Sequence, residues 1–311
     1  MNILLSTDNN YVMPTGVLMI SIGQNCGSNI NYYILTDELF SDNSKKSLIR
    51  IAEKYKSNIS FYTITQEMTK DFPFGRDDQP KGVTIATYYR LFITEFLPKE
   101  VHKILYLDGD TIVRNNIRDL WDIDISNYAI GAVRDMCERY HCSSKRLPYD
   151  MECLGYFNAG VLLINVDYWK KNNCIQVFFN CIREHADVLK LHDQDVLNIV
   201  FNDKKIFLPI TYNFQNCFLH KFNNPDRFLY IEDEIEKYKR DPAIVHFTAE
   251  DKPWKLNVFH TYTKDWRKYF FMSEWKNNPL EGEKVGNIKT RIRNFLIRHC
   301  WYTPATIYEM F

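Results

Sequence analysis

Two carboxylates separated by one glycine follow a short apolar run in the N-terminal half of the chain. Asp108, Gly109 and Asp110 come directly after Ile104-Leu105-Tyr106-Leu107. Such a run predicts a buried strand, so the two carboxylates are expected in the turn at its end. Two hard oxygen ligands at this spacing can converge on a divalent cation that also binds phosphate oxygens. The segment therefore predicts a metal site, for Mn²⁺ or alternatively Mg²⁺.

The Asp-x-Asp spacing alone is a weak signal. It recurs at Asp122 with Asp124 and at Asp193 with Asp195, and about one such pair is expected by chance in a chain of this length. Only the position after a strand distinguishes the pair at 108 and 110. The same segment also resembles the opening of haloacid-dehalogenase-type phosphatases, whose first Asp attacks phosphate. That alternative lacks the glycine those enzymes have before Thr111, and the segment comes late in the chain.

His246 and Lys252 are candidates to complete such a site. His246 stands in the short apolar run 243–247, and Lys252 follows it closely. A single histidine at a strand end is more often packed or solvated than a ligand. Imidazole is nevertheless a suitable third ligand for manganese if the fold brings it to the Asp pair, and a lysine would meet phosphate charge.

Polar side chains also follow the first apolar run, Ile3-Leu4-Leu5. Asp8, Asn10 and Tyr11 offer hydrogen bonds and an aromatic ring, without a glycine-rich fingerprint. They suit a mononucleotide held by side chains and stacking better than a dinucleotide, and the alternative is a polar helix cap. The segment 192–195 likewise is either the capped start of a helix or a group of polar side chains in a cleft.

The elements that must position these residues alternate between strand and helical patterns. Strands are expected at 3–5, 30–35, 59–64, 104–107, 128–133, 160–166 and 243–247, and helices at 44–56, 84–97 and, in two pieces, 174–202. The run 160–166 is almost wholly apolar and is expected in the centre of the sheet. Strand and helix alternation predicts a parallel sheet that binds ligands at the carboxyl ends of its strands. Past Pro209 irregular structure is expected, including Asn223, Asn224 and Pro225.

Composition excludes several functional classes. The chain of 311 residues has 39 Lys plus Arg and 39 Asp plus Glu, a balance that excludes a chain-wide electrostatic grip on nucleic acid. Its 45% hydrophobic content excludes disorder. No run approaches 18 apolar residues, and Asp8 interrupts the start before a signal-peptide core. We therefore expect a cytoplasmic protein whose eight cysteines are reduced.

The last residues differ from the rest of the chain. Between 284 and 308 there is no acidic residue, and the basic ones are Lys284, Lys289, Arg291, Arg293 and Arg298. On a helical wheel Ile288, Ile292, Phe295 and Leu296 share one face. This composition fits an interfacial helix that holds the protein peripherally on the inner face of a membrane through residues 284–301. An ordinary C-terminal helix docked on the domain is the equal alternative.

Six short blocks of the chain, taken in order, resemble glycosyltransferase family 8, which includes lipopolysaccharide galactosyl- and glucosyltransferases and glycogenin. The blocks lie at 2–11, 87–91, 103–110, 156–165, 193–198 and 246–254. The resemblance implies an α/β fold: a GT-A-type, Rossmann-like nucleotide-binding domain with a mainly parallel mixed sheet. We expect this domain at 1–282 and a basic amphipathic helical tail at 283–311.

The resemblance implies a role for each matched residue. Asp108, Asp110 and His246 would ligate Mn²⁺, and the donor would contact Ser6, Asp8, Asn10, Tyr11, Arg90, Asp108, Gly109, Asn158 and Lys252. Gln194 and Asp193 would be the catalytic residues at the donor sugar, and Asp135 would contact the acceptor. One departure is that Ala249 and Glu250 stand where bacterial members usually have a glycine shortly before Lys-Pro-Trp.

The implied activity is retaining transfer of galactose or glucose from a UDP-sugar to a glycan or glycolipid acceptor, in lipopolysaccharide or cell-surface polysaccharide synthesis. The alternatives are an inactive nucleotide-sugar-binding protein and the phosphatase named above. Glucose and galactose differ in the orientation of one hydroxyl, so the sequence does not rank them.

Overall fold

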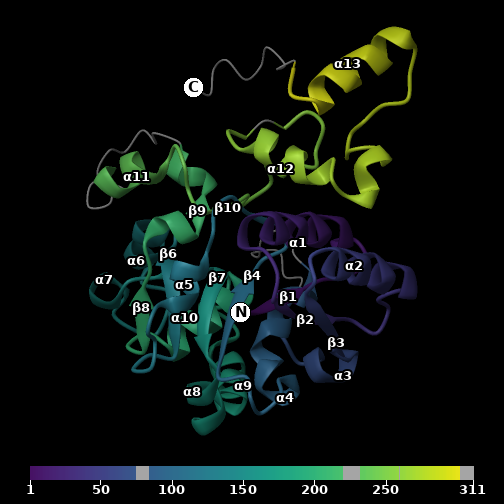
Figure 1. Cartoon of the computed structure of the whole chain (residues 1–311). Coiled ribbons are helices and arrows are strands. Elements are labelled where there is room, and N and C mark those ends of the chain that lie inside the picture. Colours follow the sequence, from purple (N-terminus) through teal and green to yellow (C-terminus); the bar gives the residue numbers. More distant parts are fainter. Residues whose placement is uncertain (75–83, 220–231, 259, 302–311) are drawn as a thin grey trace.

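A seven-stranded mixed sheet forms the centre of the computed structural model, which describes residues 1–74, 84–219, 232–258 and 260–301 (Figure 1). Its strand order is β3-β2-β1-β4-β7-β6-β8, and a second sheet has the order β5-β10-β9. The strands are β1 (Asn2–Ser6), β2 (Asn31–Thr36), β3 (Asn58–Thr63), β4 (Lys103–Leu107), β5 (Thr111–Val113), β6 (Ile130–Arg134), β7 (Phe157–Asn165), β8 (Lys205–Phe207), β9 (Phe214–Gln215) and β10 (Ile244–His246).

Helices of very different lengths connect these strands. The α-helices are α1 (Val12–Cys26), α2 (Asp42–Lys54), α3 (Gln66–Thr69), α4 (Ile93–Phe96), α5 (Arg118–Asp122), α6 (Glu138–Ser144), α7 (Met151–Leu154), α8 (Val166–Lys171), α9 (Cys174–His185), α10 (His192–Val200), α11 (Glu232–Tyr238), α12 (Thr263–Phe270) and α13 (Ile288–Arg298). The 3₁₀ helices are η1 (Ile85–Phe92), η2 (Ile210–Tyr212), η3 (Asn216–Leu219) and η6 (Glu274–Asn277). In the described part of the chain no helix is both long and apolar enough to span a bilayer.

The large sheet is mainly parallel, as expected. β1 pairs in parallel with both β2 and β4, β2 with β3, and β6 with β8. β7 is the exception, because it runs antiparallel to its neighbours β4 and β6. Apart from its last residue, β7 is buried along its whole length, which confirms the prediction that this apolar run lies inside the sheet.

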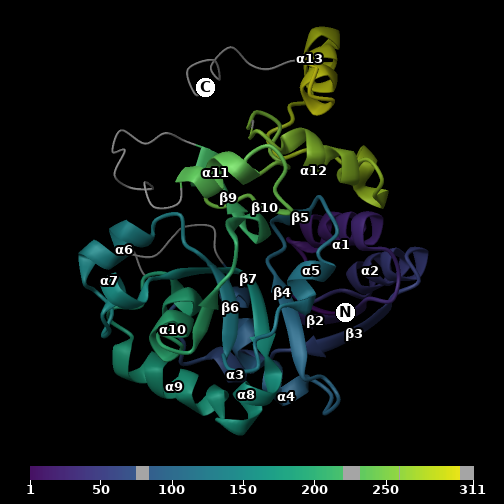
Figure 2. The same ribbon diagram turned by 60° about the vertical axis from the view of Figure 1, so that its left-hand side comes forward.

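Alternation along the strands places side chains on both faces of the sheet. In β1, Ile3 and Leu5 pack with α1 and α2, whereas Leu4 packs with η1 and the helices α8 to α10. In β4, Leu105 and Leu107 join the first cluster and Ile104 and Tyr106 the second. The fold thus has three layers, and Figure 2 shows α8, α9 and α10 gathered on one side.

The structure corrects part of the expected helix pattern. The segment predicted as one helix at 84–97 is the 3₁₀ helix η1 followed by the single-turn helix α4. In η1 the carbonyl oxygen of Thr87 accepts a hydrogen bond from Arg90 Nε at 3.1 Å. The Arg90 side chain thereby binds a carbonyl oxygen that would accept a backbone N–H in a continuous α-helix. Helices α9 and α10 confirm the two pieces predicted for 174–202.

Very short elements escaped prediction. β5, β8 and β9 have only two or three residues each, too few for a periodic signal. The segment after Pro209 is largely irregular, as expected, although it contains η2, β9 and η3. Asn223, Asn224 and Pro225 lie outside the described residues. The cysteines whose side chains are described are free thiols.

Candidate metal and donor site

The strand pairing of the small sheet brings the three expected metal ligands together. Asp108 and Asp110 lie in the turn between β4 and β5. β10 runs antiparallel to β5, with His246 opposite Thr111, and the N–H of Phe247 donates to the carbonyl oxygen of Asp110 at 3.0 Å. The histidine therefore ends up beside carboxylates that precede it by more than 130 residues.

The three side chains converge on one point. Asp108, Asp110 and His246 each offer one ligand atom, and these atoms lie within 4.8 Å of one another. His246 Nε2 is 3.2 Å from Asp110 Oδ1 and 3.8 Å from Asp108 Oδ2. Two carboxylate oxygens and one imidazole nitrogen are a donor set that suits Mn²⁺. By the chemistry of its donors, the site fits a divalent cation.

The orientation of the His246 ring is determined by its other nitrogen. His246 Nδ1 lies 3.0 Å from Asn213 Oδ1, and Asn213 Nδ2 donates to Asn158 Oδ1 at 2.9 Å. A metal-binding histidine commonly uses its second ring nitrogen in this way. The ring also packs on Gly160, where an added Cβ would lie 2.2 Å from His246 Cε1 and 2.9 Å from Asp108 Oδ2. Only a glycine on β7 leaves room for this arrangement.

Lys252 contacts the same carboxylate. Its Nζ donates to Asp110 Oδ2 at 2.5 Å and to the carbonyl oxygen of Phe247 at 2.6 Å. Burial by itself would raise the pKa of Asp110, but the charge of Lys252 and the contact with His246 outweigh it and lower that pKa below its usual range. Asp110 is therefore ionised at neutral pH and able to ligate a cation.

Arg90 links the metal site to the start of α10. Its Nη2 donates to Asp108 Oδ1 at 2.8 Å, and its Nε lies 2.9 Å from Asp193 Oδ2. Asp108 Oδ1 also accepts from the Tyr106 hydroxyl at 2.6 Å. Burial raises the pKa of Asp193 to about 6, although Arg90 and a hydrogen bond from Thr87 act in the opposite direction. Asp193 is therefore buried, and its carboxylate contacts Arg90 and Thr87.

Gln194, Asp135 and Asn158 form a connected group beside Asp193. Gln194 Nε2 and Asn158 Nδ2 each donate to Asp135 Oδ2 at 3.1 Å. Gln194 Oε1 accepts from the N–H of Ala159 at 3.0 Å. The catalytic, donor and acceptor residues expected from sequence are thus in direct contact here. Asp135 itself is buried and turned toward the other two side chains.

The expected donor residues after β1 form the turn that starts α1. Asp8 Oδ1 accepts from the N–H groups of Asn10 and Tyr11, both at 2.9 Å. Tyr11 meets the Trp254 ring edge to face at 5.5 Å, and a Cβ on Gly109 would lie 3.0 Å from Tyr11 Cδ1. Tyr11 therefore lies directly beside the turn that holds the two carboxylates. The Asn10 side chain is exposed.

Ser6 differs from the other donor candidates because its hydroxyl is buried and has no hydrogen-bond partner among the described residues. A buried hydroxyl usually has such a partner.

Several residues of the site were not singled out from sequence. Asn213 orients His246, Gly160 makes room for it, and Tyr106 supports Asp108. Asn213 and His246 are 33 residues apart and meet only because β9 pairs with β10. No local pattern marks such a contact. Gly160 lay inside a predicted strand, where an isolated glycine signals close approach of a neighbour.

The fold and this arrangement of side chains agree with the proteins that the chain resembles. A family model described as Glycosyl transferase family 8 matches residues 2–257. The chain belongs to glycosyl transferase family 8. It is 31% identical over 261 residues to a putative glycosyltransferase of Haemophilus influenzae, an alignment that covers 84% of this chain and 74% of that protein.

Two further family relatives match most of the chain. General stress protein A of Bacillus subtilis is 29% identical over 286 residues, which cover 90% of this chain and 96% of that protein. Lipopolysaccharide 1,2-glucosyltransferase of Escherichia coli K12 is 25% identical over 306 residues, 96% of this chain and 86% of that protein.

Among solved structures, the galactosyltransferase LgtC in complex with donor and acceptor sugar analogues superposes with a TM-score of 0.77 at 23% identity, covering 94% of this chain and 100% of that chain. At this identity the likeness concerns the fold, and it confirms the expected GT-A-type α/β architecture.

The C-terminal helix lies apart from this site. Figures 1 and 2 both show α12 and α13 beyond the small sheet, away from α8 and α9. On α13, Ile297 is fully buried and Asn294 nearly so, and Arg267 Nη1 donates to the carbonyl oxygen of Ile297. Ile288 and Ile292 stay 74% and 55% exposed. The helix therefore docks on the domain by one side and leaves most of the predicted apolar face uncovered.

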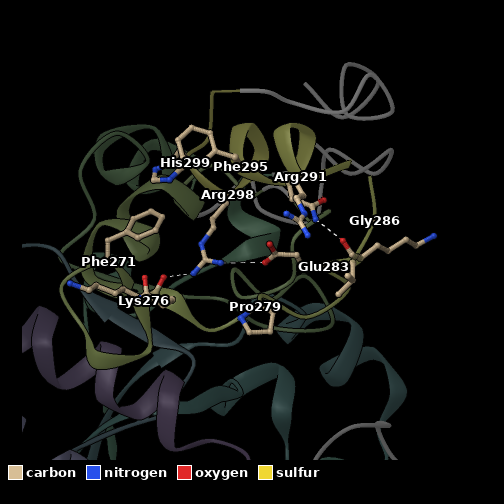
Figure 3. A pocket seen from close by; sticks show the side chains of 13 residues that line it. Phe271, Lys276, Pro279, Glu283, Gly286, Arg291, Phe295, Arg298 and His299 are labelled. Atoms are coloured by element: carbon tan, nitrogen blue, oxygen red, sulfur yellow. Dashed lines mark hydrogen bonds and ion pairs between the residues drawn. The ribbon is translucent and has the colours of Figure 1, made fainter. Parts of the chain in front are cut away.

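A cavity of about 550 Å³ lies between α13 and the segment 271–286, and Figure 3 shows it from close by. Arg298 Nη1 lies 3.4 Å from Glu283 Oε2 within it, and Arg298 Nη2 also donates to the carbonyl oxygen of Asn278 at 2.9 Å. None of the metal-site residues lines this cavity. Its contacts attach the helix to the domain.

Proposed function

We propose that this protein transfers glucose or galactose from a UDP-sugar to a glycan acceptor with retention of anomeric configuration. The observation that carries the proposal is the convergence of Asp108, Asp110 and His246 with Lys252 beside Tyr11. This grouping combines a divalent cation site, a positive side chain for phosphate and an aromatic ring for a base.

The electrostatics of the site suit a diphosphate leaving group. Cleavage of the bond between the sugar and the nucleotide develops negative charge on the diphosphate, and a bound Mn²⁺ supplies Lewis-acid stabilisation of that charge. Asp108, Asp110 and His246 would hold the cation. Lys252 is a flexible point charge that is able to turn from Asp110 toward phosphate oxygens. Tyr11, Asp8, Asn10 and Ser6 would hold the nucleoside part.

Gln194 is the proposed catalytic residue at the sugar, and Asp193 is proposed to act as a positioning residue through Arg90. The Gln194 amide is a poor nucleophile, and the Asp193 carboxylate is buried between Arg90 and Thr87. We therefore favour attack of the acceptor hydroxyl on the same face as the departing diphosphate, whose oxygen takes the hydroxyl proton. In this mechanism Gln194 stabilises the reacting sugar, and Asp193 keeps Arg90 in place.

The acceptor is proposed from the relatives. Since one of them is named a lipopolysaccharide 1,2-glucosyltransferase, we propose a lipopolysaccharide or another cell-surface glycan. Asp135, through its contact with Gln194, remains the proposed residue on the acceptor side. Family membership sets aside the phosphatase alternative, because the match spans residues 2–257. An inactive nucleotide-sugar-binding protein remains the second candidate.

The deciding experiment is a donor panel. The protein is incubated with UDP-glucose, UDP-galactose and other nucleotide sugars, with Mn²⁺, Mg²⁺ or chelator, and released UDP is measured. We expect slow metal-dependent release from a UDP-hexose without acceptor, and none from Asp108→Ala or Asp110→Ala, which should stay folded. Binding of UDP without release from any donor would favour the inactive binding protein.

We further propose that α13 brings the enzyme to an anionic membrane surface. Ile288, Ile292 and Phe295 remain exposed beside Lys289 and Arg291. Among the basic residues, Arg298 is engaged with Glu283, and Arg293 donates to Asn257 Oδ1. Glu283 balances the charge of Arg298, whereas Arg293 keeps its charge because Asn257 is neutral. Each unbalanced charge contributes on the order of 1 kcal/mol near an anionic surface. The exposed apolar side chains would supply much of the binding.

A further inference from the structure

Tyr156 lies directly before β7 and is fully buried. Its N–H donates to Glu138 Oε1 at 2.9 Å, and its carbonyl oxygen accepts from the N–H of Asp135 at 3.0 Å. Its hydroxyl donates to Asp195 Oδ1 at 2.6 Å and accepts from Gln194 Nε2 at 3.1 Å. Tyr156 thus contacts two residues of the candidate site through separate groups.

Asp195 is the wholly buried partner that determines the direction of the tyrosine hydroxyl. Its carboxylate accepts two hydrogen bonds from Arg146, both at 2.6 Å, and one from the N–H of Leu191 at 2.7 Å. Burial and the charge of Asp195 raise the pKa of Tyr156 well above its usual range. The hydroxyl therefore stays protonated. It donates a hydrogen bond to Asp195 and accepts one from Gln194.

The amide of Gln194 has a single orientation that satisfies these partners. Its two N–H donors point to Tyr156 Oη and Asp135 Oδ2, and its oxygen accepts from the N–H of Ala159. A reversed amide would set its oxygen against the Asp135 carboxylate and its NH₂ group against another donor. Such mismatches cost the desolvation of each unpaired group, about 1–3 kcal/mol.

We propose that Tyr156 is a positioning residue for Gln194. Its hydroxyl, held by Asp195 and Arg146, keeps the Gln194 amide turned so that the amide oxygen accepts from the Ala159 N–H on β7 and the NH₂ group faces Asp135. Arg146 belongs to the connection between α6 and α7, so the same network ties that segment to α10. The inference rests on the proposed function, since Gln194 matters here through its part in sugar transfer.

The test is Tyr156→Phe, which removes one oxygen atom from the network. Tyr149→Phe is the matched control, because the Tyr149 hydroxyl donates to the carbonyl oxygen of Gly155 at 3.1 Å and does not contact Gln194. For Tyr156→Phe we expect kcat to fall at least tenfold, while the KM for donor and the Kd for UDP stay within twofold of wild type. Tyr149→Phe should keep wild-type kcat. An unchanged kcat for Tyr156→Phe, or an equal loss of UDP affinity, would overturn the proposal.

A double-mutant cycle separates positioning from general stability. If Tyr156 acts through Gln194, adding Tyr156→Phe to Gln194→Ala should lower kcat no further, and a full additional loss would contradict the proposal. Should Tyr156→Phe fail to fold, Arg146→Lys keeps the charge but loses the two-point contact, and the same kcat loss without a KM change is expected.

A spectroscopic readout does not depend on turnover. In the nitrogen-15 spectrum the Gln194 side-chain amide should exchange slowly with water in wild type and faster in Tyr156→Phe. Absence of UDP release by wild type would defeat the proposed function, while equal exchange in the two proteins would defeat the positioning contact.

Discussion

Lys252 Nζ lies 2.5 Å from Asp110 Oδ2, and the other oxygen of the same carboxylate faces His246 Nε2 at 3.2 Å. A lysine and a proposed metal ligand thus share one carboxylate. A cation at Asp110 and the ammonium group of Lys252 would compete for the same negative charge. In the proposed function Lys252 turns to the diphosphate. Lys252 therefore opposes metal binding at Asp110 and favours nucleotide binding.

The first prediction follows from that competition. Lys252→Ala should bind Mn²⁺ several-fold more tightly in the absence of nucleotide, because Asp110 loses a competing partner. The same variant should bind UDP in the presence of Mn²⁺ about 10- to 100-fold more weakly, since a charged hydrogen bond is worth about 1.5–3 kcal/mol. Calorimetric titration measures both. Lys255→Ala is the control, because Lys255 Nζ donates to the carbonyl oxygen of Glu250 and not to the site. Parallel losses for both ligands would refute the shared-carboxylate account.

The second prediction concerns the space at Gly160. In Gly160→Ala the added methyl group would meet the His246 ring and Asp108 Oδ2 at distances that force a shift of both. We expect Mn²⁺ affinity to fall at least tenfold, as when a ligand loses its orientation. Gly131→Ala in β6 is the control, because its Cβ would lie no closer than 3.2 Å to the flexible Leu208 side chain. Similar Mn²⁺ affinities of the two variants would show that ring packing does not matter.

The third prediction is a pH dependence at Asp193. Burial raises the pKa of this group from 3.8 to about 6, so the folded protein holds the proton more tightly than the unfolded chain. The proton bound to Asp193 stabilises the folded protein fully below about pH 3.8, and this stabilisation is lost as the pH rises through 6. The free energy of unfolding of Asp193→Asn, relative to wild type, should therefore increase by roughly 3 kcal/mol between pH 3.5 and 7. Denaturant titrations at several pH values measure it, and a constant difference would contradict the shift.

The fourth prediction tests the backbone at Ala249, which has a φ of +59° and an exposed side chain. The left-handed conformation costs a non-glycine residue about 1–2 kcal/mol. A glycine at this position avoids that cost but loses more conformational entropy on folding, so the net gain is smaller. Ala249→Gly should raise the free energy of unfolding by about 1 kcal/mol. Ala186→Gly, at a φ of −50°, should instead lower it. A loss of stability in Ala249→Gly would show that loop contacts outweigh the strain.

The fifth prediction concerns membrane binding by α13. Truncation after Gly282 is expected to lower stability, because it would remove the buried Ile297. Ile288→Ser combined with Ile292→Ser leaves that contact intact. We expect this variant to keep its melting temperature and transfer to a soluble acceptor, while its affinity for vesicles with anionic lipid falls at least tenfold, since each buried Ile contributes about 1.5–3 kcal/mol. Leu39→Ser, at another exposed position, is the control. Equal vesicle binding by all three proteins would defeat the membrane proposal.

Strands and helices of ordinary length could be predicted because their hydrophobic pattern is local. β1 buries its three central residues and β4 buries all but its first. Polar groups were expected at the carboxyl ends of these strands, and Asp8 and Asp108 follow them there. The parallel arrangement followed from strands that alternate with helices. Predictions weakened where elements are too short for a period, as in β5 and β9, or where a side chain such as Arg90 replaces backbone hydrogen bonds.

The amino-acid sequence by itself determined which residues are candidates for the chemistry: the pair Asp108 and Asp110, His246 with Lys252, and the polar residues around Gln194. Only the tertiary structure decided how they are held. Asn213 faces His246, Gly160 lies under its ring, and the Tyr156 hydroxyl accepts a hydrogen bond from Gln194, and these residues come from segments that are distant in sequence. The physical reason is that residue type and period act within one element, whereas hydrogen-bond partners and free space depend on how separate elements pack.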